Sequence, residues 1–184
     1  FEYSEVFFQA MKQDLHQTRY QTYADLEKYM YGSAAVVGLM LSYVIGFSDT
    51  NALVYATKLG YAMQLTNFLR DIDEDFVARG RIYFPQIELN QFKISDDDIA
   101  AKNFTPQFQQ FVQFQIERAR SLYREAEIGI AMLDQKGRKA VRVASRLYAK
   151  ILQKIEQQDC NVFLGRARTK TVEKAVIMLT TKNE

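Results

Sequence analysis

The sequence predicts an all-α protein, and three observations lead to that prediction. Apolar residues recur at helical spacing along most of the 184 residues, and no segment has the strict alternation of a half-buried strand. Residues that favour helix starts and stops stand at the ends of these segments. Glycine and proline are sparse, at 8 and 2 residues, which suits long helices better than a β-rich fold with many turns.

The expected helices follow one another along the whole chain. They extend from Ser4 to Arg19, from Thr22 to Ile45, from Asp49 or Thr50 to Arg79, from Pro106 to Asp134, from Arg138 to Gln158 and from Thr171 to Leu179, with short turns after Pro85 and Ser95. Capping boxes are expected at Thr22 with Asp25 and at Ser95 with Asp98, and helix ends at Gly46, Gly80 and Gly137. The prediction is one helical domain over residues 1–184.

Composition excludes several classes of protein. Cys160 and His16 are the single residues of their kind, so a disulfide framework and multi-histidine or cysteine-rich metal sites are excluded. No run of about 18 apolar residues occurs, so no membrane-spanning helix is expected. The chain starts at Phe1 without a signal peptide. We expect a cytoplasmic protein, whose chain begins inside a longer one.

Charge is unevenly distributed along the chain. Residues 1–99 contain 8 Lys and Arg against 14 Asp and Glu, whereas residues 100–184 contain 16 against 8. A basic stripe recurs at steps of four and consists of Arg138, Arg142, Arg146, Lys150 and Lys154. It is either an ordinary solvated face or a surface for peripheral association with an anionic membrane. Nucleic acid is not an expected partner, because no aromatic residues interleave with these cations. The oligomeric state cannot be predicted.

The segment from Gln64 to Asp75 contains the candidate chemistry. Gln64, Asn67, Asp71 and Asp75 are spaced by 3, 4 and 4 residues, so they share one helix face. Like charges at i,i+4 destabilise a helix by a few tenths of a kcal/mol, and a divalent cation would reverse that sign. Mg²⁺ prefers such carboxylate oxygens and completes its shell with water and substrate phosphates. On spacing alone, an exposed acidic helix turn remains the alternative.

The flanking residues resemble the phytoene and squalene synthase family. The sequence has Asn67-Phe-Leu-Arg70-Asp71-Ile-Asp-Glu74-Asp75 and then Arg79-Gly-Arg-Ile-Tyr83-Phe-Pro85, where the family has N-x-x-R-D-x-x-E-D and R-G-R-x-Y-x-P. Supporting matches are Met11 to Leu15, Tyr29 to Gly38, Ala140 to Leu152 and Asn161 to Ala167. These matches cover nearly the whole chain in the family's order.

The resemblance implies a class I isoprenoid synthase helical bundle, incomplete at its N-terminus. The implied reaction is head-to-head condensation of two allylic prenyl diphosphates, first of all two geranylgeranyl diphosphates to phytoene, as in carotenoid biosynthesis. A squalene or dehydrosqualene synthase that uses farnesyl diphosphate is one alternative. A non-catalytic scaffold of the same fold is another. No glycine-rich dinucleotide loop is visible, so NADPH is not expected.

The resemblance also assigns roles to individual residues. Catalytic roles fall to Asp71, Asp75, Arg70 and Tyr148, with Mg²⁺, or Mn²⁺ in its place, held by Asp71 and Asp75. Substrate binding falls to Gln64, Asn67, Tyr83, Arg166, Tyr29, Ala34, Gly38, Leu41 and Met63. The family's first aspartate-rich motif would precede Phe1, so the 184-residue chain alone is expected to be inactive. Met30, Ser33 and Ala35 also depart from the family's usual Cys, Val and Gly.

Overall fold

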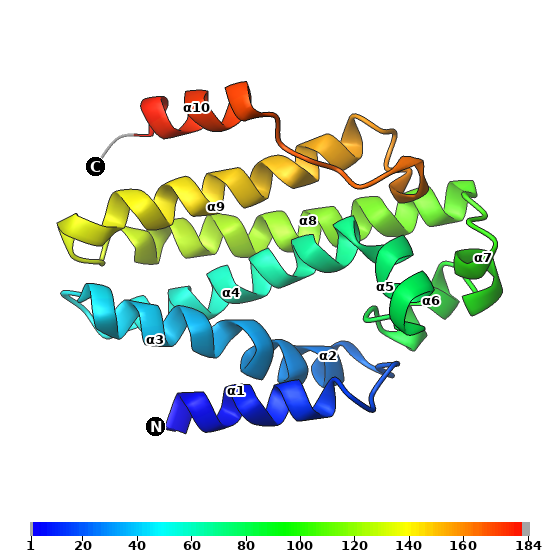
Figure 1. Ribbon diagram of the computed structural model, residues 1–184, viewed down its shortest axis with the longest axis horizontal. Coiled ribbons are helices and arrows are strands. Elements are labelled where there is room, and N and C mark those ends of the chain that lie inside the picture. The colour runs from blue at the N-terminus through cyan, green and yellow to red at the C-terminus, as the bar shows by residue number, and fades with distance from the viewer. Residues whose placement is uncertain (1, 182–184) are drawn as a thin grey trace.

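The computed structural model describes residues 2–181 as a set of helices that lie side by side (Figure 1). The elements are α1 (Glu2–Gln13), α2 (Tyr23–Met30), the π-helical η1 (Tyr31–Ala35), α3 (Val36–Ile45), α4 (Asn51–Arg70), α5 (Ile72–Arg79), α6 (Gln86–Gln91), α7 (Asp96–Ala100), α8 (Pro106–Ile130), α9 (Gln135–Glu156), the 3-10 turn η2 (Val162–Leu164) and α10 (Thr171–Thr180). Within this part of the chain, β-type pairing is confined to two isolated bridges. The all-α prediction is confirmed.

The long helices form layers around α4. In Figure 1, α1 and α3 lie on one side of α4, and α8, α9 and then α10 lie on the other. Helix α4 contacts η1, α3, α8 and α9, whereas α10 packs on α9. The short helices α5, α6 and α7 gather at one end of the layers, where α4 ends. This end contains the aspartate-rich segment.

Most helix ends that were predicted from capping residues agree with the structure. Both predicted capping boxes are present, at Thr22 with Asp25 and at Ser95 with Asp98. Thr105 caps α8, which begins at its proline. Gly80 ends α5 in the left-handed region, at φ 62°, a conformation that costs glycine little. These ends depend on residues within four positions of one another, so the sequence determines them.

Several boundaries differ from the prediction; for example, α8 ends at Ile130 rather than Asp134, and α9 begins at Gln135 rather than Arg138. The first helix ends at Gln13 rather than Arg19, because Arg19 leaves the helix to form a bridge with Ile82. The expected helix up to Arg79 is divided at Asp71, whose backbone lies at φ −109° and ψ 14°. Gly137 lies inside α9 instead of breaking the helix. A side chain there would collide with Ile45, so tertiary packing explains this glycine.

Helices α2, η1 and α3 form one continuous helical segment, Tyr23–Ile45. By length and mean hydropathy this segment would suffice to cross a membrane, although no membrane-spanning helix is expected from the sequence. Core helices of soluble proteins meet the same criterion, and this segment packs against α1 and α4. The contact with α4 is close, because a Cβ added at Gly60 would lie 2.8 Å from the Ala35 Cα.

Candidate active site

The four polar residues predicted to share a face do so despite the break in the helix. The Asp71 amide donates to the Asn67 carbonyl at 2.9 Å, and the Asp75 amide donates to the Asp71 carbonyl at 2.8 Å. Hydrogen bonding at i,i+4 therefore continues through the junction of α4 and α5. Gln64 and Asn67 line an apolar cavity on this side of α4. The junction places Asp71 and Asp75 just beyond that cavity along the chain.

Two arginines hold Asp71: Arg70, its neighbour in the sequence, and Arg166, which is 95 residues away. Arg70 donates from Nε and Nη2 to the two carboxylate oxygens, at 2.8 and 2.5 Å. Arg166 approaches the same carboxylate, with its Nε 2.9 Å from Oδ1, and its Nη1 lies 3.3 Å from Glu74. The Asp71 side chain is only 13% exposed, so these are partly buried charge-assisted contacts.

Asp75 has a different environment. Its side chain is 14% exposed and pairs with Arg79, whose Nη1 lies 2.9 Å from Oδ1. Burial, and after it the negative charge of Asp71, raise the pKa of Asp75 from 3.8 to about 6, against the opposing effect of Arg79. A carboxylate with a raised pKa holds charge that its surroundings do not fully compensate. A cation placed beside it would supply that compensation.

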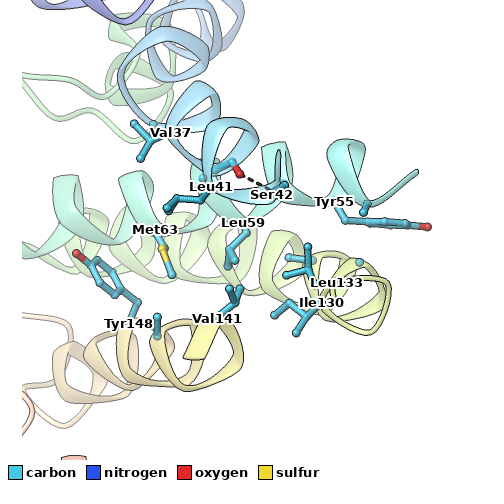
Figure 2. Close-up of a pocket in the computed structure, with 18 of the residues that line it drawn as sticks. Val37, Leu41, Ser42, Tyr55, Leu59, Met63, Ile130, Leu133, Val141 and Tyr148 are labelled. Atoms are coloured by element: carbon cyan, nitrogen blue, oxygen red, sulfur yellow. Dashed lines mark hydrogen bonds between the residues drawn. The ribbon is translucent and has the colours of Figure 1, made fainter. Parts of the chain in front are cut away.

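Four helices enclose an apolar cavity of about 310 Å³, which we call the tail cavity. Figure 2 shows Leu59 and Met63 of α4 facing Val141 of α9, with Val37 and Leu41 of α3 above them. Further lining residues are Ala34, Gly38, Gln64, Asn67, Ile130, Leu133 and Tyr148. The predicted residues Gln64, Asn67, Ala34, Gly38, Leu41, Met63 and Tyr148 are thus brought together.

The small residues from Gly32 to Gly38 serve both helix packing and the lining of the tail cavity. Gly32 packs against Ala10 of α1, and Ala35 is buried against Gly60 of α4. Ala34 and Gly38 instead line the tail cavity. Because successive helical residues point in different directions, one segment can provide both a packing face and a cavity wall.

A second hollow, of about 410 Å³, adjoins the tail cavity, and we call it the cationic hollow. Its basic residues are Arg70, Arg166, Arg168 and Lys174. Tyr148 lines both spaces. Sequence reasoning found Arg70 and Arg166 but missed Arg168 and Lys174. The excess of basic residues between 166 and 174 was the available signal, but it does not indicate which side chains turn inward.

Four predicted site residues line neither space: Asp71 and Asp75, described above, and the tyrosines Tyr29 and Tyr83. The tyrosine hydroxyls each donate to Asp14 Oδ1 at 3.0 Å, and Arg81 Nη1 lies 3.0 Å from the other oxygen of that carboxylate. Tyr83 also stacks on Phe68 with ring centroids 4.1 Å apart. Burial raises the pKa of Tyr83 to about 12, so its hydroxyl stays protonated near neutral pH. Both tyrosines therefore support the wall behind Asp75, where Tyr83 lines a small gap beside that carboxylate.

The basic stripe on α9 is largely turned toward its neighbours. Arg142 is buried and donates to Glu127, and Arg138 donates to the Leu133 carbonyl. Arg146 donates to Thr181, which follows α10. Lys154 pairs with Glu173 of α10, and Lys150 lies 3.9 Å from the same carboxylate. Helix α10 therefore covers much of the stripe. The stripe is neither a plainly solvated face nor a free cationic surface.

Protein ligands alone do not complete a metal site here. Within residues 2–181, no group of three His, Cys, Asp or Glu side chains is arranged to hold a metal ion. Asp71 and Asp75 are nevertheless one helical turn apart, and burial penalises the charge of Asp75. This donor set fits Mg²⁺ bound by two carboxylates, with water and substrate phosphates completing the shell.

The helices, the tail cavity and the adjoining carboxylates and arginines together define the class of protein, an all-α isoprenoid synthase fold. A family profile described as squalene/phytoene synthase matches residues 1–173, and the chain belongs to that family.

Individual relatives agree with this assignment. Phytoene synthase 1 of Arabidopsis thaliana, a chloroplastic protein, is 42% identical over 172 residues, which are 90% of this chain and 40% of that protein. The 15-cis-phytoene synthase of Synechococcus elongatus is 40% identical over 178 residues, which are 90% of this chain and 58% of that protein. The crystal structure of the squalene synthase HpnC from Alicyclobacillus acidocaldarius matches with a TM-score of 0.82 at 28% identity, over 87% of this chain and 60% of its own. The chain spans about half the length of the curated relatives it matches.

Proposed function

We propose that the full-length protein condenses two prenyl diphosphates head to head, with geranylgeranyl diphosphate as substrate and phytoene as product. One observation carries the proposal. The apolar tail cavity and the cationic hollow share one lining residue, Tyr148, and two arginines of the hollow, Arg70 and Arg166, contact Asp71. An amphiphile with a long hydrocarbon tail and a diphosphate head has the polarity that this pair of spaces accepts.

The cations of the hollow would bind the diphosphate head. Arg70 and Arg166 present planar guanidinium groups, which bind phosphate oxygens in pairs. Arg168 and Lys174 add positive charge at the same place. Asp71 already engages both guanidinium groups, so they are positioned before the substrate arrives. This geometry favours a head group placed between the arginines and the aspartate face.

Asp71 and Asp75 are the residues that would hold Mg²⁺, or Mn²⁺ in its place. The ion would act as a Lewis acid that stabilises the charge of the departing diphosphate. The chain's own contribution is to place two carboxylates on one face and to keep Asp75 partly desolvated. Arg79 balances part of the Asp75 charge while no cation is bound.

The walls of the tail cavity would protect the reacting carbons. Loss of diphosphate leaves an allylic cation that water would capture, so the surroundings must be apolar. Leu59, Met63 and Val141 provide such surroundings across the cavity. Tyr148 lines both the apolar and the cationic space, and an aromatic face stabilises a nearby cation.

The test is turnover of the full-length protein with geranylgeranyl diphosphate, with and without Mg²⁺. Asp71→Asn and Asp75→Asn should each lower turnover by about 100-fold or more, the usual scale for loss of a group that stabilises transition-state charge. Asp73→Asn is the matched control, because Asp73 pairs with Lys102 on another side of α5, at 2.8 Å. Equal effects of all three substitutions would contradict the assigned roles. Product formation from farnesyl diphosphate alone would instead identify a squalene or dehydrosqualene synthase.

The isolated 184-residue chain should form no product from either substrate. Its candidate metal ligands are only the two carboxylates of Asp71 and Asp75. The proposed reaction must bind the diphosphate groups of two substrates, which we expect to require further metal ligands. Product formation by the isolated chain would show that Asp71 and Asp75 are sufficient.

A further inference from the structure

Arg79 engages one oxygen of a carboxylate that we assign to the metal. It is the last residue of α5, one helical turn after Asp75, and its Nη1 lies 2.9 Å from Asp75 Oδ1. Within residues 2–181 this is the only hydrogen bond or ion pair of its side chain. The Arg79 side chain is 50% exposed, whereas that of Asp75 is 14% exposed. A surface cation is therefore held by one carboxylate that is itself mostly buried.

The other two arginines of the acidic segment are held differently. Arg70 is 17% exposed and donates twice to Asp71, and Arg166 contacts both Asp71 and Glu74. Both line the cationic hollow, whereas Arg79 lines neither the hollow nor the tail cavity. Arg79 can therefore turn away from its carboxylate at the cost of a single contact, and the binding of a substrate head does not already explain it.

The acidic segment is electrically balanced without a metal. Its carboxylates and guanidinium groups are equal in number, with Asp71, Glu74 and Asp75 against Arg70, Arg79 and Arg166. A divalent cation bound alone would leave this cluster with excess positive charge. The same cation bound together with a diphosphate would add net negative charge, because two linked phosphate groups carry about three negative charges near neutral pH.

A metal on Asp75 would lie close to Arg79. Within the described part of the chain, Asp75 Oδ2 accepts no hydrogen bond, so it is the oxygen open to an ion. With an ordinary Mg–O bond, the ion and the guanidinium would share one carboxylate at a separation on the order of 5 Å. Like charges at that distance repel each other even with the screening of water, and a divalent ion doubles the repulsion.

We propose that Arg79 selects the form in which the metal is bound, because it repels a free divalent cation and attracts the same cation once a diphosphate is attached to it. Arg79 weakens the binding of the free ion, which must approach a carboxylate that already holds a cation. Arg79 strengthens the binding of the metal–diphosphate complex, whose net charge is negative. The inference rests on the proposed function, since it takes Asp71 and Asp75 as metal ligands.

This selection couples the two ligands. If a diphosphate tightens metal binding, the metal tightens diphosphate binding by the same factor, because the coupling is reciprocal. Arg79 would contribute to that factor in both directions. An ordinary helix-stabilising pair at i,i+4 predicts no such dependence on the charge of the ligand.

The experiment is isothermal titration calorimetry of the full-length protein, first with Mn²⁺ alone and then with a preformed complex of Mn²⁺ and inorganic diphosphate. Arg79→Gln removes the charge, and Arg79→Lys keeps it. Lys102→Gln is the matched control, because it removes a cation that pairs at 2.8 Å with Asp73 of the same helix. Circular dichroism verifies that each variant folds.

Arg79→Gln should bind Mn²⁺ alone about tenfold more tightly than wild type, and the complex about tenfold more weakly. Arg79→Lys and Lys102→Gln should both stay close to wild type. The two shifts should shrink as salt is added, since Arg79 is exposed. Shifts of the same sign in Arg79→Gln would overturn the proposal, as would the absence of any shift. An Arg79→Lys variant that behaves like Arg79→Gln would also overturn it, because charge would not be the cause.

Asp75→Asn separates this proposal from the proposed function. It should lose most of the Mn²⁺ binding that depends on this site. If Asp75→Asn binds Mn²⁺ like wild type, the metal assignment fails and the role of Arg79 fails with it. If Asp75→Asn loses binding while Arg79→Gln behaves like wild type, the metal assignment stands and only the role of Arg79 is overturned.

Discussion

Arg166 Nε lies 2.9 Å from Asp71 Oδ1, although 95 residues separate them. This contact joins the segment after α9 to the junction of α4 and α5. It places a guanidinium group beside the carboxylate that we assign to the metal. The same arginine reaches Glu74, so it connects two acidic residues of the motif.

Arg166→Lys should therefore weaken substrate binding, although the substitution keeps the positive charge. Lysine keeps the positive charge but lacks the planar fork that engages carboxylate and phosphate oxygens in pairs. We expect KM for the diphosphate substrate to rise about tenfold in the full-length protein, a loss of about 1.4 kcal/mol. Steady-state kinetics measures this, with Arg124→Lys on the exposed face of α8 as control. Identical KM values in both variants would remove Arg166 from the binding site.

Asp71→Asn and Asp75→Asn should have opposite effects on stability in the absence of metal. Asp71 accepts hydrogen bonds from two arginines, so its neutralisation should cost about 1–2 kcal/mol. For a chain of this length, that lowers Tm by about 2–4 °C per kcal/mol. Asp75 is held partly desolvated, so its neutralisation should leave Tm unchanged or raise it. Thermal melts in chelator measure both, and a larger loss in Asp75→Asn would contradict the environments described.

Stability should depend on pH through Asp75. Its pKa is raised from 3.8 to about 6 in the folded protein, so between these values the folded state holds a proton that the unfolded state releases. The free energy of unfolding therefore falls as pH rises through this interval, and the loss is complete above it. Urea unfolding at several pH values measures the change. Asp75→Asn should lack this component, and parallel pH profiles for the two proteins would disprove it.

Val141→Phe should reduce the volume of the tail cavity. Val141 faces Leu59 and Met63 across the cavity, so a larger ring would fill part of it. We expect kcat/KM for geranylgeranyl diphosphate to fall about tenfold relative to that for farnesyl diphosphate, within the range for a few methylene groups. Competition between the two substrates gives the ratio. Ala140→Phe, exposed on the same turn, should leave it unchanged.

Asp14→Ala should lower the free energy of unfolding more than the substitution of any single hydrogen-bond partner of Asp14 does. The carboxylate accepts from two tyrosines and pairs with Arg81, so its removal leaves several buried polar groups without an acceptor. We expect a loss of about 3 kcal/mol, against about 1 kcal/mol for Tyr83→Phe. Chemical denaturation measures both values. A smaller effect for Asp14→Ala than for Tyr83→Phe would show that the network is not centred on Asp14.

The sequence alone determined the helices, most of their ends and the face shared by Gln64, Asn67, Asp71 and Asp75. These features depend on capping residues and on spacing within one or two turns, which are local properties of the chain. It also determined the family, because the aspartate-rich segment and its flanks match over consecutive residues.

Only the tertiary structure decided how distant residues combine. It brought Arg168 and Lys174 into the hollow beside Arg70, and it turned Tyr29 and Tyr83 toward Asp14 rather than into the cavity. It also placed α10 over the basic stripe of α9 and left Val172 and Leu179 of α10 exposed. Each of these outcomes depends on which helix packs against which, and contacts between segments tens of residues apart leave no periodic signal in the sequence.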